Sequence, residues 1–300
     1  MALLISVLGY QVRATGVDEH MYFSMLDAWR EIVQERGPSA LPEYRVTIEA
    51  RRLDVGRNLS GLAYDDGRDQ LWAVVNDPPE LLALDRKGEI LARHPLNGFQ
   101  DVEGVAYLGD DLLLLVEERR YALVVVPVPK APGPIVRAEH GALTLPAADD
   151  ENEGLEGAGY DRKADRLFVV KEHSPRKLYE VHGLRRSRSA APDIRIVDRD
   201  EWIRGTNIAS DYSSVEYLAQ SGHLALLSDE SALIVELDRD GRVVGERRLL
   251  GGFSGLHEAI PQAEGMAFDD AGRLYVVSEP NLFYAFSPVP GRLASIAPKP

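Results

Sequence analysis

One sequence pattern recurs five times and limits the folds open to this chain. Each copy contains a short apolar strand that ends on an aromatic residue, then a turn, then a second apolar strand. The copies begin roughly 40 to 60 residues apart, which is the spacing of blades in a β-propeller. The aromatic residues that end the first strands are Tyr64, Tyr107, Tyr160, Tyr217 and Phe268. We therefore predict an all-β fold, a five-bladed β-propeller with four-stranded blades.

The strands that complete a blade are clearest in residues 81–96 and 233–249, where two strands flank a turn rich in Asp and Gly. The last copy ends after three strands, near Pro288. Residues 43–53, EYRVTIEARRL, form a spare strand ahead of the first copy. We expect this strand to complete the last blade, because that closure joins the two ends of the ring and covers an open sheet edge.

The N-terminal region does not follow the repeat. Residues 2–10 are apolar but too short to cross a bilayer. We interpret them either as the remnant of a longer membrane anchor or as a buried or disordered start. Apolar residues between positions 21 and 33 recur with the spacing of an amphipathic helix. We predict two regions: an N-terminal apolar stub and amphipathic helix over residues 1–41, and the propeller over residues 42–300.

Net charge and cysteine content exclude several functions. The formal net charge is -14 and the pI is near 5.0, so nucleic acid and anionic membrane surfaces are poor partners. An acidic chain instead attracts cations. The sequence contains no cysteine, which excludes thiol chemistry and zinc sites built on cysteine.

Oxygen-bearing side chains recur at two positions of the repeat. In a propeller blade the first strand begins, and the second strand ends, at the same mouth of the central channel. The first position holds Ser60, Glu103, Glu156, Ser213 and Glu264, and the second holds Asn76, Glu117, Glu172, Asp229 and Glu279. We predict that eight of these side chains form a metal site at this mouth: Glu103, Glu156, Glu264, Glu117, Glu172, Asp229, Glu279 and Asn76.

Calcium suits such a site best, because Ca²⁺ takes six to eight hard oxygen ligands in flexible geometry. Magnesium needs a smaller octahedron, and no two histidines have the spacing of a zinc site. A glycine follows each first-strand glutamate, at Gly104, Gly157 and Gly265. Because glycine has no side chain, we expect it to let neighbouring backbones approach closely.

A second interpretation of the repeated glutamates remains open. Repeat units arise by duplication, so the motif can record common descent without any metal. Each glutamate would then pair with a nearby arginine, for which Arg119, Arg120 and Arg176 are candidates.

Three stretches resemble one family of bacterial proteins. They are residues 58–91 (NLSGLAYDDGRDQLWAVVNDPPELLALDRKGEIL), residues 98–107 (GFQDVEGVAY) and residues 276–288 (VVSEPNLFYAFSP). Over residues 44–288 the chain is similar to the SdiA-regulated family, the YjiK-like bacterial β-propellers. The resemblance implies a five-bladed propeller, distantly related to NHL-repeat proteins, with a bound calcium ion. The chain departs from the family pattern at Ser213 and Ser214, where other copies have Glu-Gly.

The same resemblance bears on location. Family members often carry an N-terminal membrane anchor or export segment, which implies a protein of the bacterial cell envelope, periplasmic or membrane-anchored. Residues 2–10 would then be what is left of a membrane tether upstream of the propeller. Because the sequence lacks a complete anchor, a cytoplasmic location is the alternative.

Two functions remain open. The first is a calcium-binding module of the cell envelope that holds a small molecule or a protein partner at the channel mouth. The second is a calcium-dependent hydrolase, similar to a lactonase or phosphoesterase, in which the metal polarises the substrate and a general base activates water. Candidates for the base are Glu117, Glu172, His173 and His257. No Gly-x-Ser-x-Gly motif is present, which argues against a serine esterase.

Overall fold

The computed structural model describes residues 39–146, 154–173, 175–188, 193–204 and 208–290. The chain divides into two compact units, Met1–Pro38 and Ser39–Pro300. The apolar stub and the amphipathic helix predicted from the sequence lie outside the described residues. All described helices and strands belong to the second unit.

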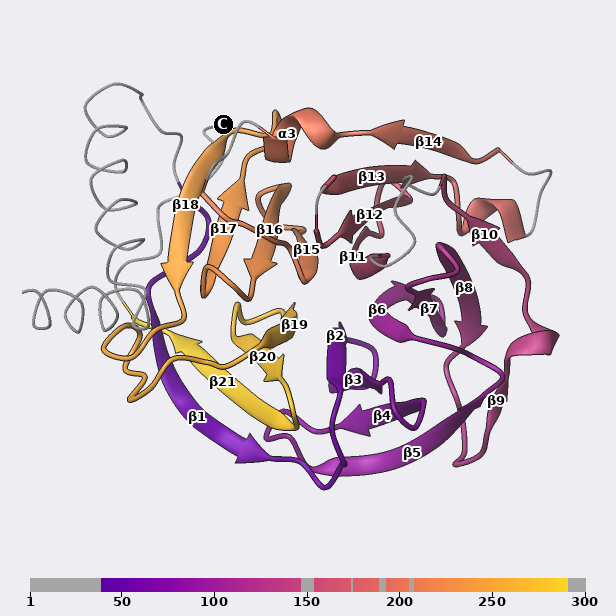
Figure 1. Cartoon of the computed structure of the whole chain (residues 1–300), viewed down its shortest axis with the longest axis horizontal. Coiled ribbons are helices and arrows are strands. Elements are labelled where there is room, and N and C mark those ends of the chain that lie inside the picture. Colours follow the sequence, from indigo (N-terminus) through magenta and orange to yellow (C-terminus); the bar gives the residue numbers. More distant parts are fainter. Residues whose placement is uncertain (1–38, 147–153, 174, 189–192, 205–207, 291–300) are drawn as a thin grey trace, which may run out of the picture. The chain divides into compact units, whose positions relative to one another are not determined.

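Five β-sheets follow one another along the second unit and form the blades of a propeller (Figure 1). Blade one contains β2 (Leu59–Asp65), β3 (Gln70–Val75), β4 (Glu80–Leu84) and β5 (Ile90–Asn97). Blade two contains β6 (Val102–Gly109), β7 (Leu112–Glu117), β8 (Ala122–Pro127) and β10 (Ala142–Thr144). Blade three contains β11 (Leu155–Asp161), β12 (Arg166–Lys171), β13 (Lys177–His182) and β14 (Arg195–Asp198).

Blade four contains β15 (Ser214–Leu218), β16 (His223–Ser228), β17 (Leu233–Leu237) and β18 (Val243–Arg248). Blade five contains β19 (Ala263–Phe268), β20 (Leu274–Ser278), β21 (Leu282–Pro288) and β1 (Tyr44–Arg52). The first strands of the blades, which are β2, β6, β11, β15 and β19, contact one another in turn around the channel. The structure is therefore the five-bladed propeller that the repeat predicts.

Strand β1 closes the ring as expected from residues 43–53. It pairs antiparallel with β21, from Tyr44 opposite Pro288 to Arg52 opposite Leu282. The strand nearest the start of the propeller thus becomes the outer strand of the last blade (Figure 1). The closure leaves β21 with a partner on both sides, so blade five has no open edge at that strand.

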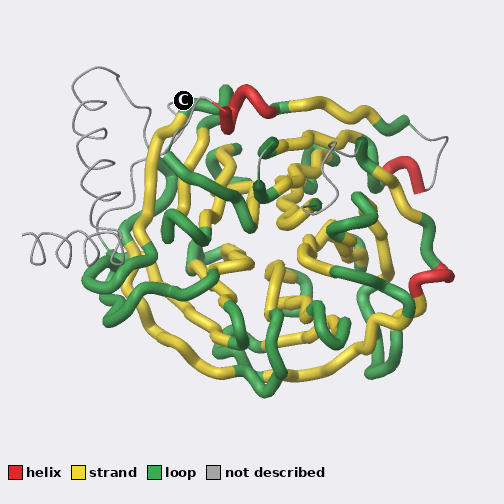
Figure 2. The backbone as a smooth tube through the Cα atoms, in the orientation of Figure 1, coloured by secondary structure: helices red, strands yellow, loops and turns green. Residues whose placement is uncertain are grey.

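Blade one departs from the four-stranded pattern. Strand β9 (Ile135–Val136), from the connection between β8 and β10, adds to it in parallel, with Leu96 opposite Ile135. Helical segments in the described residues are short, namely η1 (Arg137–Glu139), η2 (Arg186–Arg188) and α3 (Asp200–Arg204) (Figure 2). Blade one thus keeps its four predicted strands and gains β9 at its outer edge, because a long connection from blade two crosses back to it.

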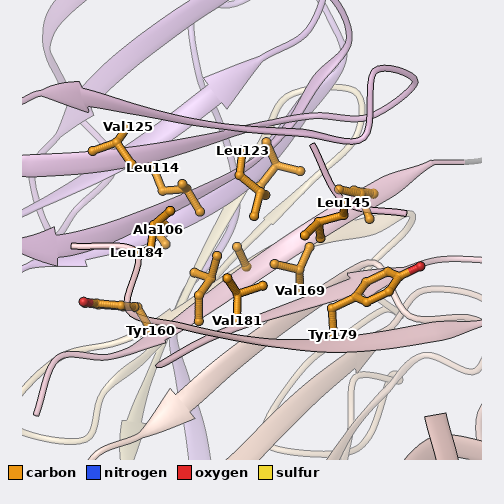
Figure 3. Packing of buried hydrophobic residues seen from close by; sticks show 14 of the residues in the cluster. Ala106, Leu114, Leu123, Val125, Leu145, Tyr160, Val169, Tyr179, Val181 and Leu184 are labelled. Carbon is orange, nitrogen blue, oxygen red and sulfur yellow. The ribbon is translucent and has the colours of Figure 1, made fainter. Parts of the chain in front are cut away.

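The hydrophobic core is divided among the interfaces between successive blades. In β7, Leu113 and Leu115 pack against blade one, whereas Leu114 and Val116 pack against blade three. Figure 3 shows the second of these interfaces, with Leu114 among the buried side chains. Because side chains alternate across a strand, a sheet covered on both faces needs apolar residues at every position. This explains the uninterrupted apolar run of β7.

Candidate metal centre

Four of the five inner strands contain a β-bulge at the repeated Glu-Gly or Ser-Gly pair, in β2, β6, β11 and β19. The bulge glycine faces the backbone of the next inner strand. A Cβ atom on Gly104 would lie 2.3 Å from the carbonyl oxygen of Glu156. A Cβ atom on Gly61, Gly157 or Gly265 would lie 2.7, 2.4 or 2.7 Å from a backbone atom. Glycine is thus required by the close approach of the inner strands, as predicted for three of these positions.

A hydrogen bond joins the start of the first strand to the end of the second. In three blades a residue with left-handed φ precedes the bulge, and its carbonyl oxygen accepts from the backbone N–H after the second strand. The acceptor and donor pairs are Asn58 and Asn76, Asp101 and Glu118, and Gln262 and Glu279. The residue after the second strand is therefore held beside the start of the first strand, at one mouth of the channel.

Glutamate 118, rather than Glu117, occupies this position in blade two. Glu117 is the last residue of β7 and pairs with Val102, and its side chain is fully buried. Its carboxylate accepts from Arg120 at 2.8 Å and from Arg137 at 2.7 Å. The structure therefore does not place Glu117 with the other predicted ligands. In every blade the residue at this mouth is the one that follows the second strand: Asn76, Glu118, Glu172, Asp229 and Glu279.

The carboxylate of Glu103 lies between blades one and two. The hydroxyl of Ser60 donates to Oε2 of Glu103 at 2.6 Å, and the side-chain amide of Asn76 donates to Oε1. Burial raises the pKa of Glu103 to about 7, with a further contribution from the charge of Glu118. Two of the predicted residues, Asn76 and Glu103, are therefore in direct contact.

Burial and mutual repulsion also act on the other predicted glutamates. The pKa of Glu156 is raised well above its usual range, first by burial and then by the charges of Glu103 and Glu172. Burial and the charges of Glu172 and Asp229 raise the pKa of Glu264 to about 9. Burial raises the pKa of Glu172 to about 7. These carboxylates are near enough for each to disfavour ionisation of the next.

Two more predicted residues belong to the same mouth. Burial raises the pKa of Asp229, whose Oδ1 accepts from the backbone N–H of Ala263 at 3.0 Å. Burial also raises the pKa of Glu279, and the nearby positive charge of Arg57 opposes that rise. Both side chains increase the negative charge around Glu264, since their charges contribute to its raised pKa.

Blade four is built differently, as the Ser213–Ser214 departure suggests. Its inner strand β15 shows no register shift against β16. The hydroxyl of Ser213 donates to the backbone carbonyl of Ala263 at 2.6 Å. The buried carboxylate of Asp211 accepts a hydrogen bond from the backbone N–H of Asp229 at 2.9 Å. In blades one, two and five a backbone carbonyl accepts the equivalent hydrogen bond. Asp211 is not among the residues predicted from the sequence. The replacement of Glu-Gly by Ser213-Ser214 in this copy could have indicated that another acidic residue acts here.

The proposed arginine partners do not pair with the first-strand glutamates. Arg120 contacts Glu117, and Arg176 donates to the backbone carbonyl of Ala209. Arg119 lies 3.6 Å from Asp101 and 3.9 Å from Glu118. In the described part of the chain, no Lys or Arg forms an ion pair with the first-strand glutamates, which are Glu103, Glu156 and Glu264. Pairing with arginine therefore does not explain why these three carboxylates gather here.

The donor set fits calcium in its chemistry, because its members are hard oxygen donors and, in the described part of the chain, Glu103, Glu156 and Glu264 form no ion pair with Lys or Arg. Within the described ranges, however, no three His, Asp or Glu side chains are already arranged as a metal-binding group. The charges of these carboxylates raise one another's pKa, but in the described part of the chain the side chains do not converge on one point.

The two histidines considered as general bases lie in different places. Nε2 of His173 is 3.4 Å from Oε2 of Glu172, so His173 belongs to the mouth. Nδ1 of His257 is 2.6 Å from Oε2 of Glu49, which lies on the outer strand β1. His257 is exposed there, and its hydrogen bond with Glu49, together with the charge of Glu49, raises its pKa. His257 therefore lies beside the outer strand of blade five and is not placed to act as a general base at the mouth.

Comparison with known proteins shows the family to which the chain belongs. Residues 38–287 match the model of the family described as SdiA-regulated, and the chain belongs to that family. A gluconolactonase from Xanthomonas campestris is 14% identical, with a TM-score of 0.49 over 86% of this chain and 99% of that one. Regucalcin from Agrobacterium tumefaciens, described as a calcium-binding protein, is 14% identical, with a TM-score of 0.48 over 80% and 93%. A streptogramin B lyase is 12% identical, with a TM-score of 0.44 over 85% and 76%.

Proposed function

We propose that this propeller binds Ca²⁺ at the carboxylate mouth and acts as a binding module for a small molecule or a protein. One observation carries the proposal: burial raises the pKa of six acidic side chains at one mouth. They are Glu103, Glu156, Glu172, Asp229, Glu264 and Glu279. A buried cluster of like charges either holds protons or binds a compensating cation. Calcium is the cation whose coordination number and oxygen preference suit such a cluster.

The residues that would hold the ion come from two positions of the repeat. Glu103, Glu156 and Glu264 come from the inner strands, and Glu118, Glu172, Asp229 and Glu279 come from the ends of the second strands. When bound, calcium supplies positive charge that favours the ionised form of these carboxylates. Several of them already link blades, for example Glu103 with Ser60 and Glu118 with the backbone N–H of Gly154. An ion at this mouth would therefore stabilise the closed ring.

A hydrolase is the second candidate, and one observation favours it. The pKa of Glu172 is raised to about 7, so this side chain is suited to accept a proton near neutral pH. His173 lies beside it and could relay the proton. The test is hydrolysis of lactones and phosphoesters by the calcium-loaded protein, with Glu172→Gln as the variant. No turnover with either substrate class leaves the binding module as the function.

Location in the cell envelope is part of the proposal and rests on the family resemblance. In the part of the chain that the structure describes, no helix is long and apolar enough to cross a membrane. Fractionation of cells that produce the full chain tests the location, with the envelope as the expected fraction.

Calcium binding is tested by calorimetric titration of EDTA-treated protein, together with its melting temperature. We expect saturable binding and a higher melting temperature with calcium. The variant Glu103→Gln with Glu156→Gln removes two inner-strand carboxylates and should abolish both effects. Glu139→Gln, an exposed residue of η1, is the matched control and should retain both. Absence of calcium binding in the wild-type protein would overturn the proposal.

A further inference from the structure

A second site lies at the opposite end of the inner strands. The carboxylates stand where these strands begin, and the five repeat aromatics stand where they end. A pocket of about 680 Å³ is lined there by residues of all five blades. Its wall includes Tyr64, Tyr107, Tyr160, Tyr217 and Phe268. This volume is in the range of sites for small organic ligands and far exceeds the space that a bare metal ion needs.

At this level the inner strands of blades one, two, three and five carry small residues, and the inner strand of blade four carries a carboxyl. The residue just before each repeat aromatic is Ala63, Ala106, Gly159, Glu216 or Ala267. Glu216 lines the pocket together with Ala63 and Ala106. A Cβ atom on Gly159 would lie 2.8 Å from the Cα of Glu216, so β11 and β15 touch here. The small residues leave space around the single carboxyl.

The carboxyl of Glu216 has no cationic partner among the described residues. Its Oε2 accepts a hydrogen bond from the neighbouring backbone N–H of Tyr217 at 3.2 Å. Burial raises the pKa of Glu216 to about 8. The positive charge of Arg162 opposes this rise in pKa, but the guanidinium of Arg162 donates its hydrogen bonds to Asp66, at 2.7 and 2.8 Å. At pH 7 the carboxyl of Glu216 therefore holds a proton, and a ligand that brings positive charge would favour its ionised form.

Two other acidic residues of the pocket are neutralised by arginine. Asp161 lies 2.9 Å from Nη2 of Arg166, and Asp269 lies 2.6 Å from Nε of Arg273. These side chains already have cations, whereas Glu216 does not. The third acidic residue of the lining, Asp270, is exposed to solvent. Glu216 is therefore the partly buried carboxyl of this lining that has no ion pair with a cation in the described part of the chain.

The aromatic wall of the pocket is apolar toward a ligand. The hydroxyl of Tyr64 donates to Asp69 at 2.8 Å, and that of Tyr160 donates to Asp165 at 2.6 Å. With these hydroxyls engaged within their own blades, the rings line the space.

An arginine already lies over three of the rings: Arg86 over Tyr64, Arg162 over Tyr107 and Arg166 over Tyr217. Among the described residues, no cation lies over Tyr160 or Phe268, so these two rings are the ones open to a ligand. Phe268 adds a ring without a hydroxyl. Aromatic rings together with a carboxylate form the environment that binds organic ammonium ions.

We propose that this pocket binds a small organic cation, an amine or quaternary ammonium with an apolar body, whose charge lies against Glu216. The site is separate from the calcium centre at the other mouth and goes beyond the calcium-binding function. The net charge of -14 also favours the approach of cations.

Calorimetric titration with benzyltrimethylammonium tests the proposal, with benzyl alcohol as the neutral probe and benzoate as the anionic one. We expect saturable binding of the cation, at least tenfold weaker binding of the alcohol, and no binding of benzoate. Glu216→Gln should weaken binding of the cation at least tenfold, whereas Glu139→Gln, an exposed residue of η1 outside the pocket, should leave it unchanged. Equal affinity for cation and alcohol, or full affinity in Glu216→Gln, would overturn the proposal.

A second variant keeps the test decisive if Glu216→Gln does not fold. Ala164 lines the pocket at an exposed turn, so a substitution there spares the core. Ala164→Arg places a positive charge at the rim and should weaken binding of benzyltrimethylammonium by tenfold or more. Ala164→Gln is the uncharged control of similar length and should bind the cation more tightly than Ala164→Arg does. Equal binding by the two variants would contradict a site that selects positive charge.

Discussion

Replacing Glu264 by Gln should stabilise the calcium-free protein and destabilise the calcium-bound one. Burial and the surrounding carboxylates raise the pKa of Glu264 from 4.5 to about 9. Between these two values the folded state holds a proton that the unfolded state releases. The free energy of unfolding therefore falls as pH rises through this window. Each pKa unit corresponds to about 1.4 kcal/mol, so the loss at pH 7 is about 3 kcal/mol.

Glu264→Gln removes the titrating group and with it this loss. In EDTA at pH 7 the variant should unfold with a free energy higher than wild type by up to about 3 kcal/mol, and the difference should vanish near pH 4.5. With saturating calcium the order should reverse, because the variant has lost a ligand. Urea denaturation at several pH values, in EDTA and in calcium, measures both effects.

Glu139→Gln is the matched control, since Glu139 is an exposed carboxylate of η1 outside this mouth. It should change neither the pH dependence nor the response to calcium. If Glu264→Gln is no more stable than wild type in EDTA at pH 7, Glu264 does not carry a raised pKa in the folded state. The same conclusion follows if wild-type stability does not fall between pH 4.5 and pH 9.

Three further predictions concern the same mouth. Gly104→Ala should lower the free energy of unfolding by about 2 kcal/mol in urea denaturation, because its Cβ would clash with the carbonyl oxygen of Glu156, whereas Gly133→Ala, with open space around it, should change little. Glu117→Gln should lower stability by about 3 kcal/mol, because it leaves two arginines without their buried partner, yet retain the calorimetric calcium affinity that Glu118→Gln loses. Calcium affinity should rise with pH between about 5 and 9, because the ion displaces protons from carboxyls of raised pKa, and titration in buffers of different ionisation enthalpy should detect their release.

The fold was predictable because its constraints are local and repeated. Apolar residues on both faces of strands such as β7 indicate sheets packed between sheets. The repeat interval predicts the size of a blade. The extra strand ahead of the first copy, which is β1, predicts how the ring closes. The bulge glycines were also readable, since no other residue lets inner strands approach so closely. Strand β9 could not be predicted, because two residues in a long connection are too few to show the alternation of apolar and polar residues that marks a strand.

The sequence by itself determined the number of blades, the closure and the gathering of acidic residues at one mouth. Only the tertiary structure decided which acids face the channel. Side chains alternate along a strand, so a difference of one residue in the strand end exchanges Glu118 for Glu117, and the second is buried against arginines. Likewise, contact with Glu49 places His257 at the rim, and Glu216 lines a pocket because five strand ends converge there. Such placements depend on contacts between blades, which no local pattern in one copy contains.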